Sequence, residues 1–191
     1  GMGAYSPVPH LEKWLPEIEE TIIGPMVKGL QQEGIDFQGI LYTGLMITKD
    51  GPKVVEFNVR FGDPEAQVIL PRLQNDLLEI LEASTAGGLS SIKLTWKQEA
   101  CVCVIAASGG YPGDYKTGVP ISGLKSGAND MVFHAGTKIV GTNLVTNGGR
   151  VLNVSSLGES LTQARTRAYE RLQNIHFEKM HYRTDIASKA I

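Results

Sequence analysis

The chain has 191 residues, of which 42% are hydrophobic and 20% charged, and its formal net charge is −2. This composition is ordinary for a globular chain, and the length is enough for one large core or two small ones. The nearly balanced charge gives no electrostatic footprint for nucleic acid, and no apolar stretch approaches the roughly 18 residues of a membrane helix. We therefore expect no nucleic-acid partner, no membrane partner and, without a recognisable export leader, a cytoplasmic location.

The first predicted helix follows an extended entry segment. Two prolines interrupt residues 5–9, so that stretch cannot be a regular helix. From about Glu12 to Glu33, apolar residues recur at three- and four-residue spacing, namely Leu15, Ile18, Ile22, Met26, Val27 and Leu30. Gly24-Pro25 should kink or split the helix, which we expect to be a scaffold packed on a sheet.

Two antiparallel strands are predicted next. Gly39 to Ile47 is rich in apolar and aromatic residues, a turn over residues 49–52 follows, and Val54 to Phe61 continues as the second strand. Side chains alternate between the two sides of a strand. One side of the second strand is therefore apolar, and the other is polar, carrying Glu56, Asn58 and Arg60.

The polar side has two interpretations. A carboxylate and an amide oxygen two residues apart, as at Glu56 and Asn58, are hard ligands that suit Mg²⁺. The Arg60 guanidinium on the same side suits a phosphate or a carboxylate. The alternative is the solvated side of an ordinary antiparallel strand, which is the commonest kind of strand. The pattern alone leaves both interpretations open.

The loop after this strand also has a structural interpretation. Asp63 can act as a helix N-cap, Pro64 fits a first helical position, and Glu65 complements the positive helix end.

The remaining elements indicate an α+β pattern. A helix capped by Asn75 or Asp76 should run to Ala86, where Gly87-Gly88 ends it, and a domain boundary is expected near residues 96–99. Later elements are short strands over Ala100 to Ala107, Met131 to Ile139 and Leu144 to Val154, and a helix over Ser160 to Asn174.

For three local features we favour a structural role over a catalytic or metal-binding one. Cys101 and Cys103 share one side of a strand and are expected to be buried thiols, because no partner pair completes a metal site. His134 is expected to be packed or hydrogen-bonded rather than catalytic. Residues 147–149 (Asn-Gly-Gly) predict a hairpin turn, because these residues tolerate positive φ.

Residues 60–67 (Arg-Phe-Gly-Asp-Pro-Glu-Ala-Gln) resemble the signature of the phosphoribosylamine–glycine ligases, also called glycinamide ribonucleotide synthetases, which are ATP-grasp enzymes of de novo purine synthesis. Four other segments resemble that family in the family's order: residues 1–7, 109–115, 133–137 and 146–151. The resemblance therefore covers nearly the whole chain.

This resemblance implies a fold and a reaction. Residues 1–97 would be the back half of an ATP-grasp module, an antiparallel sheet with helices, and residues 98–191 a small carboxy-terminal α+β domain of the ligase. The implied reaction joins glycine to 5-phosphoribosylamine through a glycyl phosphate, giving glycinamide ribonucleotide, ADP and phosphate. In the family, an amino-terminal substrate domain and the front of the ATP-grasp module come before residues 1–7. The chain is therefore expected to be a portion that is inactive alone and has that amino-terminal half as a partner.

The resemblance also assigns roles to the polar residues. Glu56 and Asn58 would hold Mg²⁺ or Mn²⁺ beside the co-substrate ATP, Arg60 would bind a phosphate or a substrate carboxylate, and Asp63 would orient the substrate amine or brace the loop. Other metal ligands would be water or come from elsewhere. The rival hypothesis is a folded, non-catalytic remnant or assembly module. A different ATP-grasp carboxylate-amine ligase is a further alternative, against which residues 60–67 argue.

Overall fold

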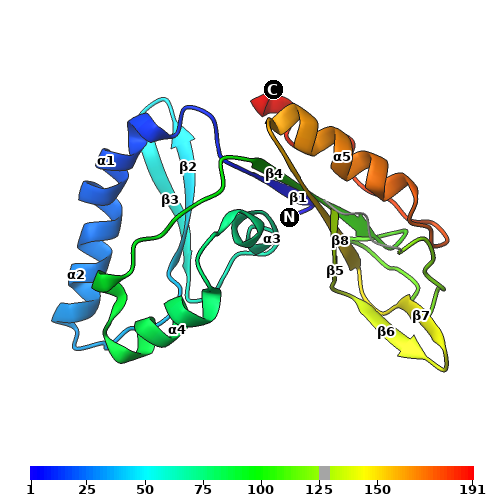
Figure 1. The fold of residues 1–191 in the computed structure, drawn as a ribbon, viewed down its shortest axis with the longest axis horizontal. Coiled ribbons are helices and arrows are strands. Elements are labelled where there is room, and N and C mark those ends of the chain that lie inside the picture. The colour runs from blue at the N-terminus through cyan, green and yellow to red at the C-terminus, as the bar shows by residue number, and fades with distance from the viewer. Residues whose placement is uncertain (125–129) are drawn as a thin grey trace. The chain divides into compact units, whose positions relative to one another are not determined.

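The computed structural model describes residues 1–124 and 130–191, and the chain forms two compact units (Figure 1). Unit 1 comprises Gly1–Pro7, Asp63–Leu73 and Trp96–Ile191, and unit 2 comprises Val8–Gly62 and Gln74–Thr95. One passage between the units falls between Thr95 and Trp96, at the edge of the predicted boundary region. The division into residues 1–97 and 98–191 stays a prediction about domains. In the structure, Gly1–Pro7 and Asp63–Leu73, which lie within residues 1–97, belong to unit 1 together with residues 98–191.

A four-stranded antiparallel sheet forms the centre of unit 1. Its strand order is β1 (Gly3–Ser6), β4 (Ala100–Ala107), β8 (Arg150–Gly158) and β5 (Asp130–His134). The first strand pairs with β4 across almost a hundred residues of sequence, with Gly3 opposite Val104. The entry segment is therefore an edge strand of this sheet.

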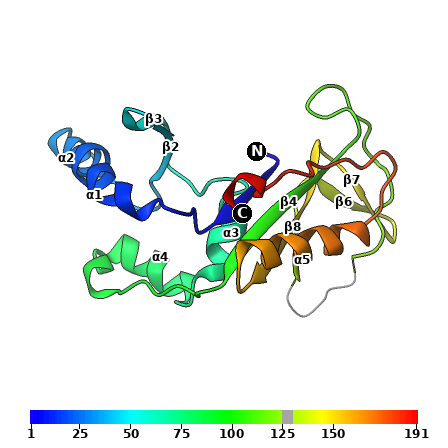
Figure 2. The ribbon, with the colours of Figure 1, turned by 90° about the horizontal axis from the view of Figure 1, so that it is seen from above.

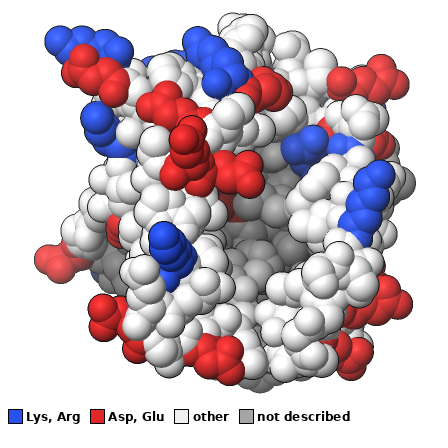
Figure 3. Space-filling view, turned by 90° about the vertical axis from the view of Figure 1, so that its left-hand side faces the viewer, with Lys and Arg blue, Asp and Glu red and all other residues white. Residues whose placement is uncertain are grey.

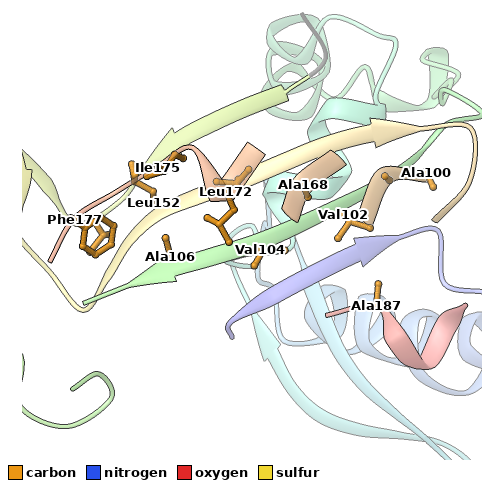
Figure 4. Packing of buried hydrophobic residues seen from close by; sticks show 13 residues of the cluster. Ala100, Val102, Val104, Ala106, Leu152, Ala168, Leu172, Ile175, Phe177 and Ala187 are labelled. Atoms are coloured by element: carbon orange, nitrogen blue, oxygen red, sulfur yellow. The ribbon is translucent and has the colours of Figure 1, made fainter. Parts of the chain in front are cut away.

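Both sides of β4 are buried, and each side packs on a different helix. Ala100, Val102, Val104 and Ala106 belong to the core that includes α5 (Leu161–Gln173), whose Ala164, Ala168 and Leu172 recur at four-residue spacing (Figure 4). On the other side Cys101, Cys103 and Ile105 pack with Val68 of α3 (Ala66–Ile69). A strand buried on both sides is a continuous apolar run, as residues 100–107 are. Figure 2 shows α5 lying along β4 and β8.

The helix predicted over Ser160 to Asn174 is confirmed as α5, with Leu161 and Gln173 as its first and last residues. Ser160 is the N-cap, its side chain accepting a hydrogen bond from the Gln163 amide, and Asn174 is the C-cap. A Cβ at Gly158, where β8 ends, would lie 2.5 Å from the Ala164 nitrogen, so this glycine lets the strand approach the helix closely.

Two strand predictions in unit 1 were wrong. Residues 131–139 are not one strand, because β5 ends at His134 and a separate strand, β6 (Thr137–Val140), pairs with β7 (Asn143–Thr146). Residues 144–154 are not one strand either, because β7 ends at Thr146 and β8 begins at Arg150. The hairpin turn predicted at residues 147–149 was also wrong, because β8 pairs with β4 and β5. Gly148 and Gly149 do not have positive φ. Gly149 instead lets the Tyr111 ring approach the backbone, since a Cβ there would lie 2.1 Å from that ring.

Unit 2 contains a segmented helix, a two-stranded sheet and a second helix. The segmented helix consists of η1 (Glu12–Trp14), α1 (Leu15–Ile18), the π-helical η2 (Glu19–Ile23) and α2 (Gly24–Gln32). The expected interruption at Gly24-Pro25 takes the form of this π turn, in which the Gly24 amide donates to the Glu19 carbonyl five residues back. Proline cannot donate the next helical bond, so a local change of helix type accommodates it.

The hairpin of unit 2 is formed by β2 (Tyr42–Thr48) and β3 (Gly51–Asn58). The turn is shorter than predicted, since Gly51 and Pro52 already belong to β3. The predicted second strand ends at Asn58 rather than Phe61. Between the pairs Leu45–Val54 and Gly44–Glu56 the register shifts, so Val55 is an extra, bulged residue.

The second helix of unit 2, α4 (Leu77–Ala86), matches its prediction. Asp76 caps it by accepting a bond from the Leu78 amide at 2.8 Å, and Gly87 ends it with φ +73°. Short 3₁₀ turns are η3 (Leu70–Arg72), η4 (Leu89–Ser91) and η5 (Ser188–Ala190). Residues 90–98 contain no named strand, and within them Trp96 forms an isolated bridge with Leu73.

The surface shows the even charge balance of the sequence. On the face drawn in Figure 3, acidic and basic side chains both occur among uncharged residues. In the described residues, no helix is long and apolar enough to cross a lipid bilayer.

Candidate active site

The three predicted polar residues of the second strand form one hydrogen-bonded row in unit 2. The Asn58 side-chain amide donates to Glu56 Oε1 at 2.9 Å, and Arg60 donates to Asn58 Oδ1 at 3.2 Å. Arg60 lies two residues beyond the end of β3, and it also donates to the Phe61 carbonyl at 2.9 Å. The structure therefore brings Glu56, Asn58 and Arg60 together even though the strand is shorter than predicted.

Local backbone features make room for this row. Gly44 faces Glu56 across the hairpin, and a Cβ there would lie 3.2 Å from Glu56 Cγ. The bulge at Val55 immediately precedes Glu56, and bulges commonly re-aim side chains near functional sites.

The apolar side of this strand tests the alternative that the polar side is only the solvated side of an ordinary antiparallel strand. An ordinary amphipathic strand buries its apolar side, yet Val55 is 64% exposed, Val59 74% and Phe57 37% among the described residues. The described part of unit 2 therefore does not provide the core that this interpretation requires.

Glu56 and Asn58 fit a magnesium ion as a partial ligand set. Their side chains, a carboxylate and an amide, are in contact, and Mg²⁺ usually retains several waters or takes phosphate oxygens for its remaining positions. Within residues 1–124 and 130–191, no group of three or more His, Cys, Asp or Glu side chains could hold a metal by itself. The residues present thus suit an ion that is only partly coordinated by protein.

Asp63, the fourth predicted residue, belongs to unit 1 and is not a helix cap. The N-cap of α3 is Glu65, and it makes no side-chain cap bond. Asp63 lies in the preceding turn, where its Oδ1 accepts from the Gln67 side-chain amide at 3.0 Å and its Oδ2 is paired with Arg150. The Asp63 side chain therefore contacts the side chains of Gln67 and Arg150 instead of capping the backbone of α3.

Arg150 is a residue that the site prediction did not include. Its guanidinium contacts Asp63 Oδ2 and donates to the backbone carbonyls of Asp63 at 3.1 Å and Gly1 at 3.0 Å. The available signal was its position in segment 146–151, which carries the family resemblance but was considered only for a turn at residues 147–149.

The segments that carry the family resemblance meet in unit 1. The Ser108 amide, next to segment 109–115, donates to the Gly149 carbonyl at 2.8 Å, and the Gly136 amide donates to the Arg150 carbonyl at 2.9 Å. Arg150 in turn reaches Gly1 and Asp63. The Arg150 guanidinium therefore joins segments 1–7 and 60–67, while the backbone of residues 149–150 contacts Gly136 and Ser108.

The thiols of Cys101 and Cys103 pack against Val68 of α3 and are unreactive. Cys101 and Cys103 are free and buried, as predicted. Burial raises the pKa of each thiol to about 12, because a thiolate would be poorly solvated there. They are therefore protonated at neutral pH and do not act as nucleophiles.

Two further features lie away from the predicted residues. His134 is exposed and hydrogen-bonded through Nδ1 to Thr137 Oγ1 at 3.1 Å, consistent with a structural role. A cavity of about 330 Å³ in unit 1 is lined by Ser108, Thr146, Phe177 and Lys179 among others, and none of the predicted site residues borders it.

Comparison with known proteins assigns this arrangement to a family. Residues 1–66 match the model of the phosphoribosylglycinamide synthetase ATP-grasp (A) domain, and residues 101–189 match the model of the C domain of the same enzyme. The chain belongs to the phosphoribosylglycinamide synthetase family. The match to the ATP-grasp model contains Glu56, Asn58, Arg60 and Asp63, and the match to the C-domain model contains Arg150.

Members of this family resemble the chain along nearly all of its length. The phosphoribosylamine–glycine ligase of Caldanaerobacter subterraneus subsp. tengcongensis is 52% identical over 189 residues, which are 98% of this chain and 45% of that protein. The crystal structure of phosphoribosylamine–glycine ligase from Thermotoga maritima superposes with a TM-score of 0.88 at 35% identity, covering 98% of this chain and 46% of that one. The chain spans about half the length of the relatives that it matches.

A more distant structure shows how widely the fold is shared. The biotin carboxylase domain of the Hydrogenobacter thermophilus 2-oxoglutarate carboxylase, solved with MgADP, ADP and bicarbonate, has a TM-score of 0.64 at 15% identity. It covers 95% of this chain and 40% of that chain. The likeness shows that the fold also occurs in a biotin carboxylase domain.

Proposed function

We propose that the enzyme containing these residues ligates glycine to 5-phosphoribosylamine at the expense of ATP. ATP phosphorylates the glycine carboxylate, the amine of phosphoribosylamine attacks the glycyl phosphate, and glycinamide ribonucleotide, ADP and phosphate result. The observation that carries the proposal is the hydrogen-bonded row Glu56–Asn58–Arg60, which lies within the match to the ATP-grasp model.

Glu56 and Asn58 are the proposed metal ligands. Each can offer a hard oxygen, and the hydrogen bond from the Asn58 amide nitrogen to Glu56 Oε1 keeps the two side chains in contact. A Mg²⁺ or Mn²⁺ ion bound there would supply charge neutralisation for the phosphates of ATP.

Arg60 is the proposed partner of a phosphate or of the glycine carboxylate. Of its five N–H donors, one donates to Phe61 O and one to Asn58 Oδ1. Three donors therefore remain for an anionic substrate group, and a planar guanidinium can use two of them together.

Asp63 is the proposed partner of a substrate amine. A carboxylate has about four acceptor sites, and the structure uses one on each oxygen, for Gln67 and for Arg150. Its side chain is also 46% exposed, so the remaining sites are open to an ammonium or amine donor.

Catalysis by such a site consists of positioning and charge neutralisation. The acyl phosphate forms by direct phosphoryl transfer, which requires no protein nucleophile, and the protonated thiols of Cys101 and Cys103 provide none. The chemistry therefore suits the exposed oxygen and guanidinium groups that the chain presents.

The remaining length of the relatives supplies the proposed partner. The 189 matched residues cover 45% of the Caldanaerobacter ligase, and we propose that turnover also needs an amino-terminal half. Half a site leaves the phosphates and the acyl phosphate poorly held, which removes the positioning that supplies most of the acceleration. A cytoplasmic location stays a prediction from the sequence.

The test is coupled ADP release, with glycine, phosphoribosylamine and Mg²⁺ omitted in turn. A full-length ligase carrying these residues should release ADP only when all are present, whereas the 191 residues alone should release none. Recovery on mixing with a separately made amino-terminal half would support a divided site. ADP release that is independent of glycine would refute the proposed reaction, and a complete lack of activity in the full-length protein would favour a non-catalytic remnant.

A further inference from the structure

We propose that Arg150 is a positioning residue of the ligase, which holds the Asp63 carboxylate ready for the amine of a substrate. The inference rests on the proposed function and adds to it a residue from the C-domain portion of the chain. Arg150 touches no reacting atom in this scheme, because it acts through Asp63.

The contacts of Arg150 converge on one loop. A single guanidinium contacts the Asp63 carboxylate, the Asp63 carbonyl and the Gly1 carbonyl. The two aspartate contacts restrain both the side chain and the backbone of the same residue. The contact with Gly1 ties a second segment of the family resemblance to the same point.

The base of Arg150 is fixed. It is the first residue of β8, it lies opposite Ala107 in the β4–β8 pairing, and its carbonyl accepts from the Gly136 amide. The next residues, Val151 and Leu152, are completely buried. An arginine anchored in this way has few alternative positions, and its own side chain is only 22% exposed.

Asp63 is held from two directions. Gln67, on the first turn of α3, donates to Oδ1 at 3.0 Å, while Arg150 contacts Oδ2. A carboxylate that is 46% exposed and has no such partners would rotate freely, so the two contacts define the plane in which its remaining lone pairs lie. Pre-set acceptor orientation is what a substrate-positioning carboxylate requires.

The residue type also fits this role. The guanidinium uses NH1 for the two backbone carbonyls and NH2 for the carboxylate, so two nitrogens at a fixed separation are employed at once. Lysine offers a single nitrogen and cannot reproduce that fork. A purely electrostatic role would tolerate lysine, whereas a positioning role would not.

A double-mutant cycle in the full-length ligase tests the proposal. Arg150→Gln and Asp63→Asn should each lower kcat/KM for the amine substrates about tenfold or more, while KM for ATP changes by less than about twofold. Because Arg150 acts through Asp63, the double variant should be no more impaired than Asp63→Asn alone. Arg150→Lys should recover less than about a third of the lost kcat/KM.

Arg165 provides the matched control. It belongs to the same unit and donates from two guanidinium nitrogens to the carbonyls of Ile186 and Thr184, away from Asp63. Arg165→Gln should lower the melting temperature but leave kcat/KM within about twofold, because it removes only structural bonds. Gln67→Leu removes the opposite restraint on Asp63 and should impair the same parameter as Arg150→Gln, even if the latter folds poorly.

Three results would overturn the inference. These are multiplicative losses in the double variant, full activity of Arg150→Lys, or a loss in Arg165→Gln that equals the loss in Arg150→Gln. All of them presuppose a wild-type enzyme that releases ADP only with glycine and phosphoribosylamine. If the wild type fails that test, the proposed reaction fails, and the same cycle read by thermal unfolding still measures whether Arg150 and Asp63 are coupled.

Discussion

In unit 1 every residue of β4 is buried and the strand has a helix on each side, whereas in unit 2 Ile18 is the only large apolar side chain buried among the described residues. Unit 2 instead exposes Met46, Val55, Val59 and Leu78. Burial of apolar surface is the main favourable term in folding, so unit 1 should be the more stable of the two.

The difference also concerns the proposed chemistry. Unit 1 contains an aspartate restrained by partners from two elements, and unit 2 contains a row that is hydrogen-bonded mainly to itself. Unit 2 thus combines the proposed metal ligands with the weaker core. This suggests that its residues need further packing partners to become rigid, while the Asp63 loop is already held.

The largest expected effect is on thiol reactivity. At pH 8, Cys101 and Cys103 should react with iodoacetamide roughly a thousandfold more slowly in the folded chain than in urea, because a pKa of about 12 instead of 9.0 lowers the thiolate fraction by that factor. A cysteine introduced by Val55→Cys in unit 2 should react at nearly the unfolded rate. Mass spectrometry of labelled peptides measures both, and rapid labelling of Cys103 in the native chain would show that unit 1 opens readily.

Truncation of one leucine in each unit compares the two cores. Leu172→Ala on α5 should cost about 2–5 kcal/mol of unfolding free energy, because it leaves a cavity in a closed core. Leu78→Ala on α4, where the side chain is 62% exposed, should change it by less than about 0.5 kcal/mol. Urea unfolding of the two variants gives the comparison, and equal losses would contradict the difference between the units.

Substitutions in the proposed metal site should alter activity without altering the fold. In a full-length ligase, Glu56→Gln or Asn58→Ala should lower turnover about tenfold or more and raise the Mg²⁺ requirement, because each removes a hard oxygen ligand or its charge. Glu82→Gln, an exposed carboxylate on α4, is the matched control and should leave both unchanged. Normal metal dependence in both variants would show that Glu56 and Asn58 only form the solvated side of a strand.

Helix caps provide the smallest and most local comparison. Ser160→Ala at α5 and Asp76→Ala at α4 each remove one side-chain bond to a backbone amide, worth about 1 kcal/mol. In unit 1 the loss should appear in global unfolding. In unit 2 it should appear mainly as faster hydrogen exchange in the first turn of α4, because that helix opens locally. A shift of the global transition by both variants would mean that the units unfold together.

Much of the fold was predictable because the signals are local. The limits of β4 follow from an uninterrupted apolar run, and those of α4 follow from a cap residue at the start and glycines at the end. The row of Glu56 and Asn58 follows from two-residue alternation, which survives the early end of β3. Arg60 joins it only because its long side chain turns back.

Other features depend on contacts that the local sequence does not encode. The segment 147–149 was assigned to a hairpin from its glycines, but the structure uses Gly149 to admit the Tyr111 ring, 38 residues away in sequence. Asp63 was assigned as a cap from its neighbours, but its partner is Arg150. Glycine can occupy a turn or a close contact, and aspartate can cap a helix or pair with a cation. In both cases a segment that is distant in sequence determines which role the residue has.

The sequence by itself determined the α+β class, the helices with strong caps, the buried thiols and the family, because periodicity, capping chemistry and an eight-residue signature are all local properties. Only the tertiary structure decided that the entry segment pairs with β4, that two early segments join unit 1, and that Arg150 reaches Asp63 across 87 residues. The physical reason is that strand pairing and ion pairing depend on which surfaces the packed core brings together, and many pairings are compatible with the same local pattern.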